Sequence, residues 1–113
     1  MTREYDKLVR DRIPEIIERN GETPVVRTAS DDAEYEAYLL EKLQEEVDEY
    51  VESRDPEELA DVLEVAHEIR EFEGLSEREL RDRRGRKAEE KGGFADRIVL
   101  ERVVSGDNET ERR

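Results

Sequence analysis

The sequence contains no cysteine, and it has a single histidine and a single methionine among its 113 residues. The absence of cysteine excludes disulfide bonds, thiolate nucleophiles and thiolate metal ligands. Aromatic residues make up only 5% of the chain and hydrophobic residues 34%. A domain of this length with so little apolar material would form only a modest core as a monomer. We therefore expect a homo-oligomer, a dimer or tetramer, that buries additional apolar surface.

Long hydrophobic runs are also missing. No apolar stretch approaches the roughly 20 residues needed to cross a bilayer, so we expect no membrane association. The first residues are charged and do not form the apolar centre of a signal peptide. Cytoplasmic localisation is the resulting expectation.

Positive charge is scarce, because 34 acidic residues face 20 basic ones and the net charge is −14. Such a chain is poorly suited to bind a nucleic acid duplex or an anionic membrane, which both require phosphate neutralisation by Lys and Arg. Only four of the basic residues are lysines. An acidic, lysine-poor surface fits a halophilic protein, because salt in the cytoplasm screens the repulsion between like charges.

Hydrophobic periodicity and capping residues predict a mainly α-helical fold. Three segments are typical of helix N-termini: Ser30-Asp31-Asp32, Asp55-Pro56-Glu57-Glu58 with a capping Asp, and Ser76-Glu77-Arg78-Glu79 with a capping box. Asn20-Gly21 and Gly74 are typical of helix ends. The predicted helices cover about residues 11–20, 30–53, 55–72 and 76–91.

Two short segments rich in β-branched residues, 24–29 and 97–104, are predicted to be strands that pair in a small two-stranded element. The helices and this element would form a single domain over residues 1–104. Residues 105–113 are polar, and we expect a disordered tail there.

Five acids in two clusters are the most informative feature of the chain. Glu45, Glu46 and Glu49 lie on one predicted helix, and Glu58 and Asp61 lie on the next. Carboxylates three or four positions apart share a helix face, and two antiparallel helices would direct both clusters into one volume. Glu46, Glu49 and Glu58 also fall within the apolar arcs of their helices, where acids placed for solubility should not lie.

Buried carboxylates without partners are unfavourable unless a cation compensates their charge. Mg²⁺ prefers oxygen ligands in an octahedral shell, and Mn²⁺ is a substitute with similar preferences. The alternative is that the acids form a solvated helix face, because an acidic helix shows this spacing by chance. Glu58 would then be only the third-position acid of its capping box.

The main concentrations of positive charge lie near the two ends of the chain. Lys7 and Arg10 precede the first helix, and Lys87 and Lys91 lie just before Gly92-Gly93. These side chains are candidates for binding phosphate oxygens. The alternative is that they form salt bridges with neighbouring acids. His67, the one histidine, is expected to be a packed or half-exposed residue.

The sequence resembles the all-α nucleoside triphosphate pyrophosphohydrolases, the MazG-like proteins, to which phosphoribosyl-ATP pyrophosphohydrolase is related. E-E-V-D-E at residues 45–49 and E-L-A-D at 58–61 resemble their metal motif. K-L-V-R-D-R-I-P-E-I-I at 7–17 and K-A-E-E-K-G-G-F at 87–94 are similar to a subgroup of small single-domain members. The likeness covers about residues 3–104.

The resemblance implies a MazG-like helical bundle completed by oligomerisation. It also implies that Mg²⁺ is held by Glu46, Glu49, Glu58 and Asp61, with Glu45 as a further ligand or the base, so that Glu45 and Glu46 are the candidate catalytic residues. The implied reaction is hydrolysis of a nucleoside triphosphate to the monophosphate and pyrophosphate, and the expected role is the removal of non-standard nucleotides.

Two alternative functions remain open at this point. The first is phosphoribosyl-ATP pyrophosphohydrolase activity in histidine biosynthesis, although Val65 stands where that enzyme has a histidine and the spacer between Glu49 and Glu58 is short. The second is a non-catalytic acidic helical module that oligomerises or binds a basic protein.

Overall fold

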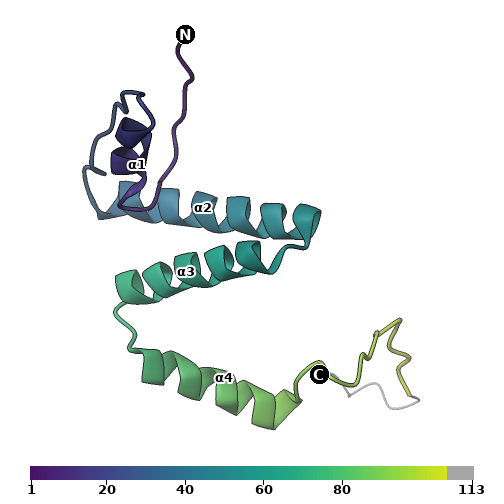
Figure 1. The fold of residues 1–113 in the computed structure, drawn as a ribbon. Coiled ribbons are helices and arrows are strands. Elements are labelled where there is room, and N and C mark those ends of the chain that lie inside the picture. The colour runs from purple at the N-terminus through teal and green to yellow at the C-terminus, as the bar shows by residue number, and fades with distance from the viewer. Residues whose placement is uncertain (107–113) are drawn as a thin grey trace. The chain divides into compact units, whose positions relative to one another are not determined.

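The computed structural model describes residues 1–106 (Figure 1). The helices in this part of the chain are α1 (Ile13–Arg19), α2 (Asp32–Ser53), α3 (Pro56–Glu73) and α4 (Glu77–Lys91). The predicted mainly α-helical class is therefore confirmed. Two compact units are distinguished, Met1–Leu80 and the chain from Arg81 onward, and each is described by itself. The prediction of one domain over residues 1–104 stays a prediction.

Side-chain caps define where the helices begin. The carboxylate of Asp31 accepts a hydrogen bond from the backbone N–H three residues later at 2.9 Å, and Asp55 accepts one from the N–H two residues later at 3.0 Å. Ser76 and Glu79 form a reciprocal capping box, with each side chain accepting from the other residue's backbone N–H at 3.0 and 2.8 Å. These bonds satisfy N–H groups that have no partner within the helix. All three predicted N-termini are confirmed.

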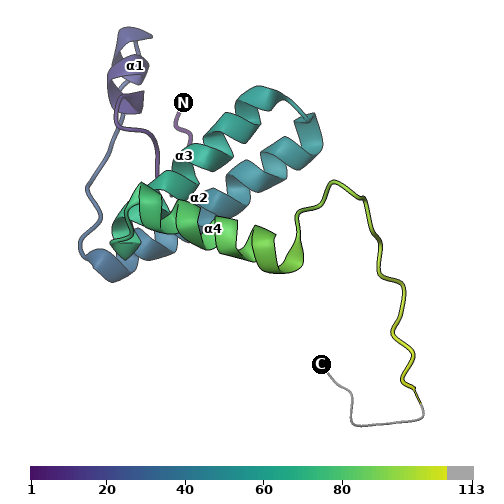
Figure 2. The ribbon, with the colours of Figure 1, turned by 90° about the horizontal axis from the view of Figure 1, so that it is seen from below.

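A tight turn joins α2 to α3. Arg54 adopts the left-handed conformation, with φ of 60°, and its backbone N–H donates to the carbonyl of Tyr50 at 2.7 Å. Its guanidinium Nε donates to the carbonyl of Val51 at 2.8 Å, which satisfies a second carbonyl at the end of the helix. Asp55 follows and caps α3, so the chain reverses within two residues. Consequently, α3 runs antiparallel along α2, as both views show (Figures 1 and 2).

The core of the first unit lies between α2 and α3. Leu39 on α2 is 1% exposed and Val65 on α3 is 8% exposed, and these are the buried hydrophobic residues of the described chain. Tyr35 and Phe72 add an edge-to-face ring contact between the same helices, with centroids 5.7 Å apart. The antiparallel pair is thus held by a small set of apolar contacts.

The same helix pair leaves apolar side chains on its surface. Two lie on α3, where Leu59 and Leu63 are 45% and 66% exposed, and the others on α2 are Leu40, Val47 and Val51. Part of the apolar arc of α3 therefore faces outward. Homo-oligomerisation, which would cover such a surface, stays a prediction.

The predicted two-stranded element is wrong. Neither residues 24–29 nor residues 97–104 form a strand, and the described chain contains no strand. β-Branched residues favour extended backbone, but a strand also needs hydrogen bonds to a neighbour. Val25 and Val26 are 96% and 63% exposed, so this segment has not packed as a strand on a core. The predicted disordered tail falls mostly on residues 107–113, which lie outside the described residues.

Across residues 1–106, none of the helices combines the length and the apolar character that crossing a membrane requires.

Candidate metal centre

Carboxylates from α2 and α3 converge as the sequence predicts. Oxygens of Glu45, Glu46 and Glu49 lie within 4.8 Å of one another, and oxygens of Glu46, Glu58 and Asp61 do so as well. Glu46 belongs to both groups. The spacing of the acids places them on one face of each helix, and the turn at Arg54 brings the two faces together. We call these five residues the carboxylate cluster.

Glu46 is the buried member of this cluster and the one buried acid among residues 1–106. The residue is 6% exposed. Its Oε2 accepts from the Lys42 ammonium at 2.9 Å, whereas its Oε1 is buried without a hydrogen-bond partner within the described chain. A buried polar atom left unpaired lowers stability by about 1–3 kcal/mol. The unpaired Oε1 is therefore available to coordinate a cation.

Three cationic side chains compensate part of the negative charge of the cluster. Lys42 bridges Glu46 and, at 3.6 Å, Glu45. Lys7 lies 3.2 Å from the other oxygen of Glu45, and Arg10 lies 2.7 Å from Asp61. Five carboxylates face three cations, so two negative charges remain uncompensated, and a single divalent cation carries the charge that would neutralise them.

Lys7 and Arg10 reach the cluster from the extended segment that precedes α1. The hydroxyl of Tyr38 on α2 donates to Asp6 and fixes this segment beside the helix. Both basic residues were predicted to bind phosphate, and the structure places their side chains on carboxylates at the edge of the cluster. Each is about half exposed, at 41% for Lys7 and 55% for Arg10. They are thus accessible to a ligand that approaches the cluster.

Lys42 was missed in the sequence interpretation. Its side chain is only 16% exposed, although it carries a charge. The available signal was its spacing of three and four residues from Glu45 and Glu46, which places the three side chains on one helix face.

Two members of the cluster have shifted acidities. Partial burial acts to raise the pKa of Glu45, but hydrogen bonding to Lys7 and the charge of Lys42 outweigh it, and the net pKa is lowered. The pKa of Glu58 is raised, first by desolvation and then by the negative charges of Glu49, Asp61 and Glu46. Glu58 is therefore the acid whose ionisation the metal-free cluster opposes.

This shift predicts a pH-dependent effect of Glu58→Gln. The folded-state pKa of Glu58 lies above its ordinary 4.5, so the stability contributed by its protonated form is present below pH 4.5 and is lost as pH rises through the folded-state pKa. In a metal-chelating buffer at pH 7, we expect Glu58→Gln to melt at a higher temperature than the wild type. The advantage should shrink as the pH falls and Glu58 protonates. Thermal unfolding of both proteins across this pH range tests the prediction, which a lower melting temperature for the variant at pH 7 would contradict.

The residues present fit a hard divalent cation. All five candidate donors are carboxylates, which suit Mg²⁺ and Mn²⁺ better than metals that select nitrogen or sulfur. The cluster offers one buried carboxylate with an unpaired oxygen, and Glu49 is exposed, so one side remains open to water and substrate. Mg²⁺ commonly retains several waters and substrate oxygens beside one or two carboxylates.

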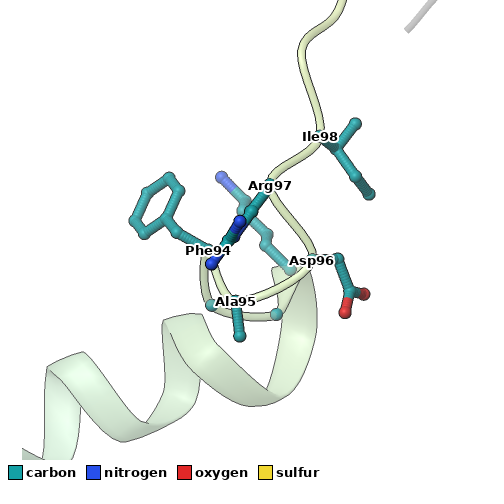
Figure 3. Close-up of a pocket in the computed structure, with 8 residues that line it drawn as sticks. Phe94, Ala95, Asp96, Arg97 and Ile98 are labelled. Atoms are coloured by element: carbon teal, nitrogen blue, oxygen red, sulfur yellow. The ribbon is translucent and has the colours of Figure 1, made fainter.

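The other predicted phosphate-binding residues lie in the second unit. Lys87 and Lys91 are exposed residues of α4. A hollow of about 220 Å³ follows the helix and is lined by the consecutive residues 91–98. Figure 3 shows this turn, with Phe94 and Asp96 pointing away from it on opposite sides. The backbone N–H of Arg97 closes it by donating to the carbonyl of Phe94 at 3.1 Å. Phosphate binding by Lys87 and Lys91 stays a prediction.

Comparisons with known proteins give one partial relative. A stretch of 43 residues is 65% identical to a protein of Mycolicibacterium smegmatis described as an uncharacterized protein. The match covers 38% of this chain and 43% of that protein, so the chain spans less than half of the relative's length. No protein-family model matches the chain, and no solved structure matches it.

Proposed function

We propose that this protein is a Mg²⁺-dependent nucleotide pyrophosphohydrolase with its active site at the carboxylate cluster. The observation that carries the proposal is the buried Glu46, which has an unpaired Oε1 and whose carboxylate lies close to carboxylates from a second helix. An acidic face that served only solubility would not bury one carboxylate against others. The resemblance of both acid motifs and both end segments to MazG-like proteins supports the choice of reaction.

In the proposed reaction, one water is added across the bond between the α and β phosphates, which yields a nucleoside monophosphate, pyrophosphate and a proton. Glu46, Glu49, Glu58 and Asp61 would hold Mg²⁺, which when bound supplies charge neutralisation of the phosphates. Glu45, whose pKa is lowered and which is therefore ionised at neutral pH, would orient the attacking water and accept its proton.

Lys7 and Arg10 would contact phosphate oxygens during this reaction. In the structure Lys7 donates a hydrogen bond to Glu45, and Arg10 donates one to Asp61. Both basic residues therefore lie at the edge of the cluster, where the substrate would bind. A cation bound among the carboxylates would weaken the ion pairs that Glu45 and Asp61 form with Lys7 and Arg10. The phosphate oxygens of the substrate would offer the two basic side chains new hydrogen-bond acceptors. Non-standard nucleoside triphosphates are the proposed substrates and the cytoplasm the proposed location.

Pyrophosphate release from a panel of nucleotides in the presence of Mg²⁺ tests the proposal. The panel should contain standard and non-standard nucleoside triphosphates and phosphoribosyl-ATP, so that the histidine-biosynthesis alternative is measured directly. We expect Glu49→Gln and Asp61→Asn to lower the rate by about tenfold or more, because each removes a charged ligand from the metal site.

The matched controls are Glu36→Gln on α2 and Glu73→Gln on α3. Both remove one exposed charge from the same helices but lie far along them from the cluster, so their activity should equal that of the wild type. Absence of turnover for every nucleotide, or equal rates in the cluster variants and the controls, would refute the proposed function. A protein without activity and without a response to Mg²⁺ would fit the non-catalytic interaction module.

A further inference from the structure

Lys42 differs from the other two cations of the carboxylate cluster in its burial. Its side chain is 16% exposed, whereas those of Lys7 and Arg10 are 41% and 55% exposed. Lys42 lies four residues before Glu46 on α2, a spacing that places both side chains on one helix face. Breaking a buried ion pair leaves an uncompensated buried charge, which is strongly destabilising. Lys42 should therefore stay with Glu46 when a ligand binds.

The two carboxylate oxygens of Glu46 have different surroundings. Oε2 accepts from the Lys42 ammonium at 2.9 Å. Oε1 is buried and has no hydrogen-bond partner among residues 1–106. As long as Lys42 occupies Oε2, Glu46 can offer a metal ion only its other oxygen.

The number of oxygens that a carboxylate offers affects which cation it suits. Mg²⁺ requires a nearly ideal octahedral shell and usually keeps several waters in it, so it needs few carboxylate oxygens. Ca²⁺ takes about six to eight oxygens in a flexible geometry and often binds both oxygens of one carboxylate. A central carboxylate that is restricted to one oxygen therefore suits Mg²⁺ and removes a ligand from Ca²⁺.

We propose that Lys42 is a positioning residue of the metal site, which holds Oε2 of Glu46, restricts this carboxylate to one coordinating oxygen and so favours Mg²⁺ over Ca²⁺. The same ion pair compensates the buried charge of Glu46 before a metal binds, so the metal-free chain can fold. The inference rests on the metal site of the proposed function, but its tests use the metal ions alone and require no turnover.

Lys42→Met tests the selectivity, because the unbranched methionine fills the space of the lysine chain and leaves Oε2 of Glu46 free. Titration calorimetry with Mg²⁺ and with Ca²⁺ gives the ratio of the two dissociation constants. The wild type should prefer Mg²⁺, and in Lys42→Met the ratio should shift toward Ca²⁺ by about tenfold or more. A loss of structure alone would weaken both ions alike. An unchanged ratio, or a wild type that prefers Ca²⁺, would overturn the proposal.

Lys7→Met is the matched control for the selectivity. It removes an exposed ammonium that lies 3.2 Å from Glu45, and Lys42 still occupies Oε2 of Glu46. Its ratio of Mg²⁺ to Ca²⁺ affinity should therefore equal that of the wild type. A shift toward Ca²⁺ as large as that of Lys42→Met would show that the net charge of the cluster sets the preference, and it would overturn the role given to Lys42.

Thermal unfolding in a metal-chelating buffer tests the compensation of charge. Lys42→Met leaves Glu46 buried without a counter-ion and should lower the melting temperature by about 10 °C or more. Lys42→Met/Glu46→Gln also removes the carboxylate charge, so it should melt at a higher temperature than Lys42→Met. If Lys42→Met does not fold without metal, a folded double variant supports the proposal and an unfolded one overturns it. A Lys42→Met protein as stable as the wild type would overturn it as well.

These measurements distinguish a failure of this inference from a failure of the proposed function. A wild type that turns over no nucleotide would refute the proposed function, while the ion affinities and melting temperatures would still decide the role of Lys42. Normal turnover with an unchanged ion preference in Lys42→Met would overturn the role of Lys42 alone. A wild type that binds neither ion would overturn both.

Discussion

Replacing Glu46 with glutamine is expected to reduce Mg²⁺-dependent pyrophosphate release by about a hundredfold or more. Glu46 is the carboxylate shared by the two acidic groups and the one with a buried, unpaired oxygen. Loss of groups that merely support a metal ligand already costs about 10–100-fold in metal affinity or activity, so loss of the central ligand should cost at least as much. The amide is similar in size but lacks the charge that attracts a cation.

A second measurement separates loss of the metal site from loss of the fold. Mg²⁺ binds the folded state of the wild type and should raise its melting temperature, whereas Glu46→Gln should show little or no rise. Glu36→Gln, an exposed charge on the same helix, should retain both the activity and the response to Mg²⁺. If Glu46→Gln keeps the rate and the response of the wild type, the cluster is not the metal site. If it fails to fold in metal-free buffer, Glu49→Gln provides the same comparison at an exposed position.

Helix boundaries were readable from the sequence because the signals that define them are local. Asp31, Asp55 and Ser76 each accept a hydrogen bond from a backbone N–H two or three residues away, so no tertiary contact is needed to place them. The strands were misassigned for the opposite reason. A strand depends on a partner elsewhere, and the β-branched residues at 24–29 and 97–104 indicate only an extended backbone.

The sequence predicted which acids form the site, but it did not predict which basic side chains pair with them. Helical spacing placed Glu46 and Asp61 on the facing sides of α2 and α3, and the structure brings them together. The turn that permits this depends on Arg54 in a left-handed conformation. Glycine is the residue that usually indicates this conformation in a sequence, so an arginine gave no indication of the turn. The pairing of Lys7 and Arg10 with carboxylates 38 and 51 residues away depends on the path of the segment before α1, and no local pattern encodes that path.

Leu39→Ala is expected to be the most destabilising single substitution in the helix pair. Leu39 is 1% exposed, and within the described chain only Val65 joins it as a buried hydrophobic residue. Truncating a buried leucine to alanine typically costs about 2–5 kcal/mol through lost transfer energy and the remaining cavity. In a small domain this corresponds to a fall in melting temperature of about 10 °C or more. Because total stability is commonly about 5–15 kcal/mol, a large fraction of the protein's stability would be lost.

Leu40→Ala is the matched control, because the same atoms are removed one position along the same helix from a residue that is 52% exposed. Both variants gain the same helix propensity, so the difference between their unfolding free energies isolates burial at position 39. Urea unfolding followed by circular dichroism measures both, and the loss in Leu40→Ala should stay below about 1 kcal/mol. A similar loss in the two variants would contradict the assignment of Leu39 as the centre of the core. Concentration dependence of the Leu40→Ala loss would then show that a second copy covers the exposed face of α2, since only an intermolecular contact makes unfolding depend on protein concentration.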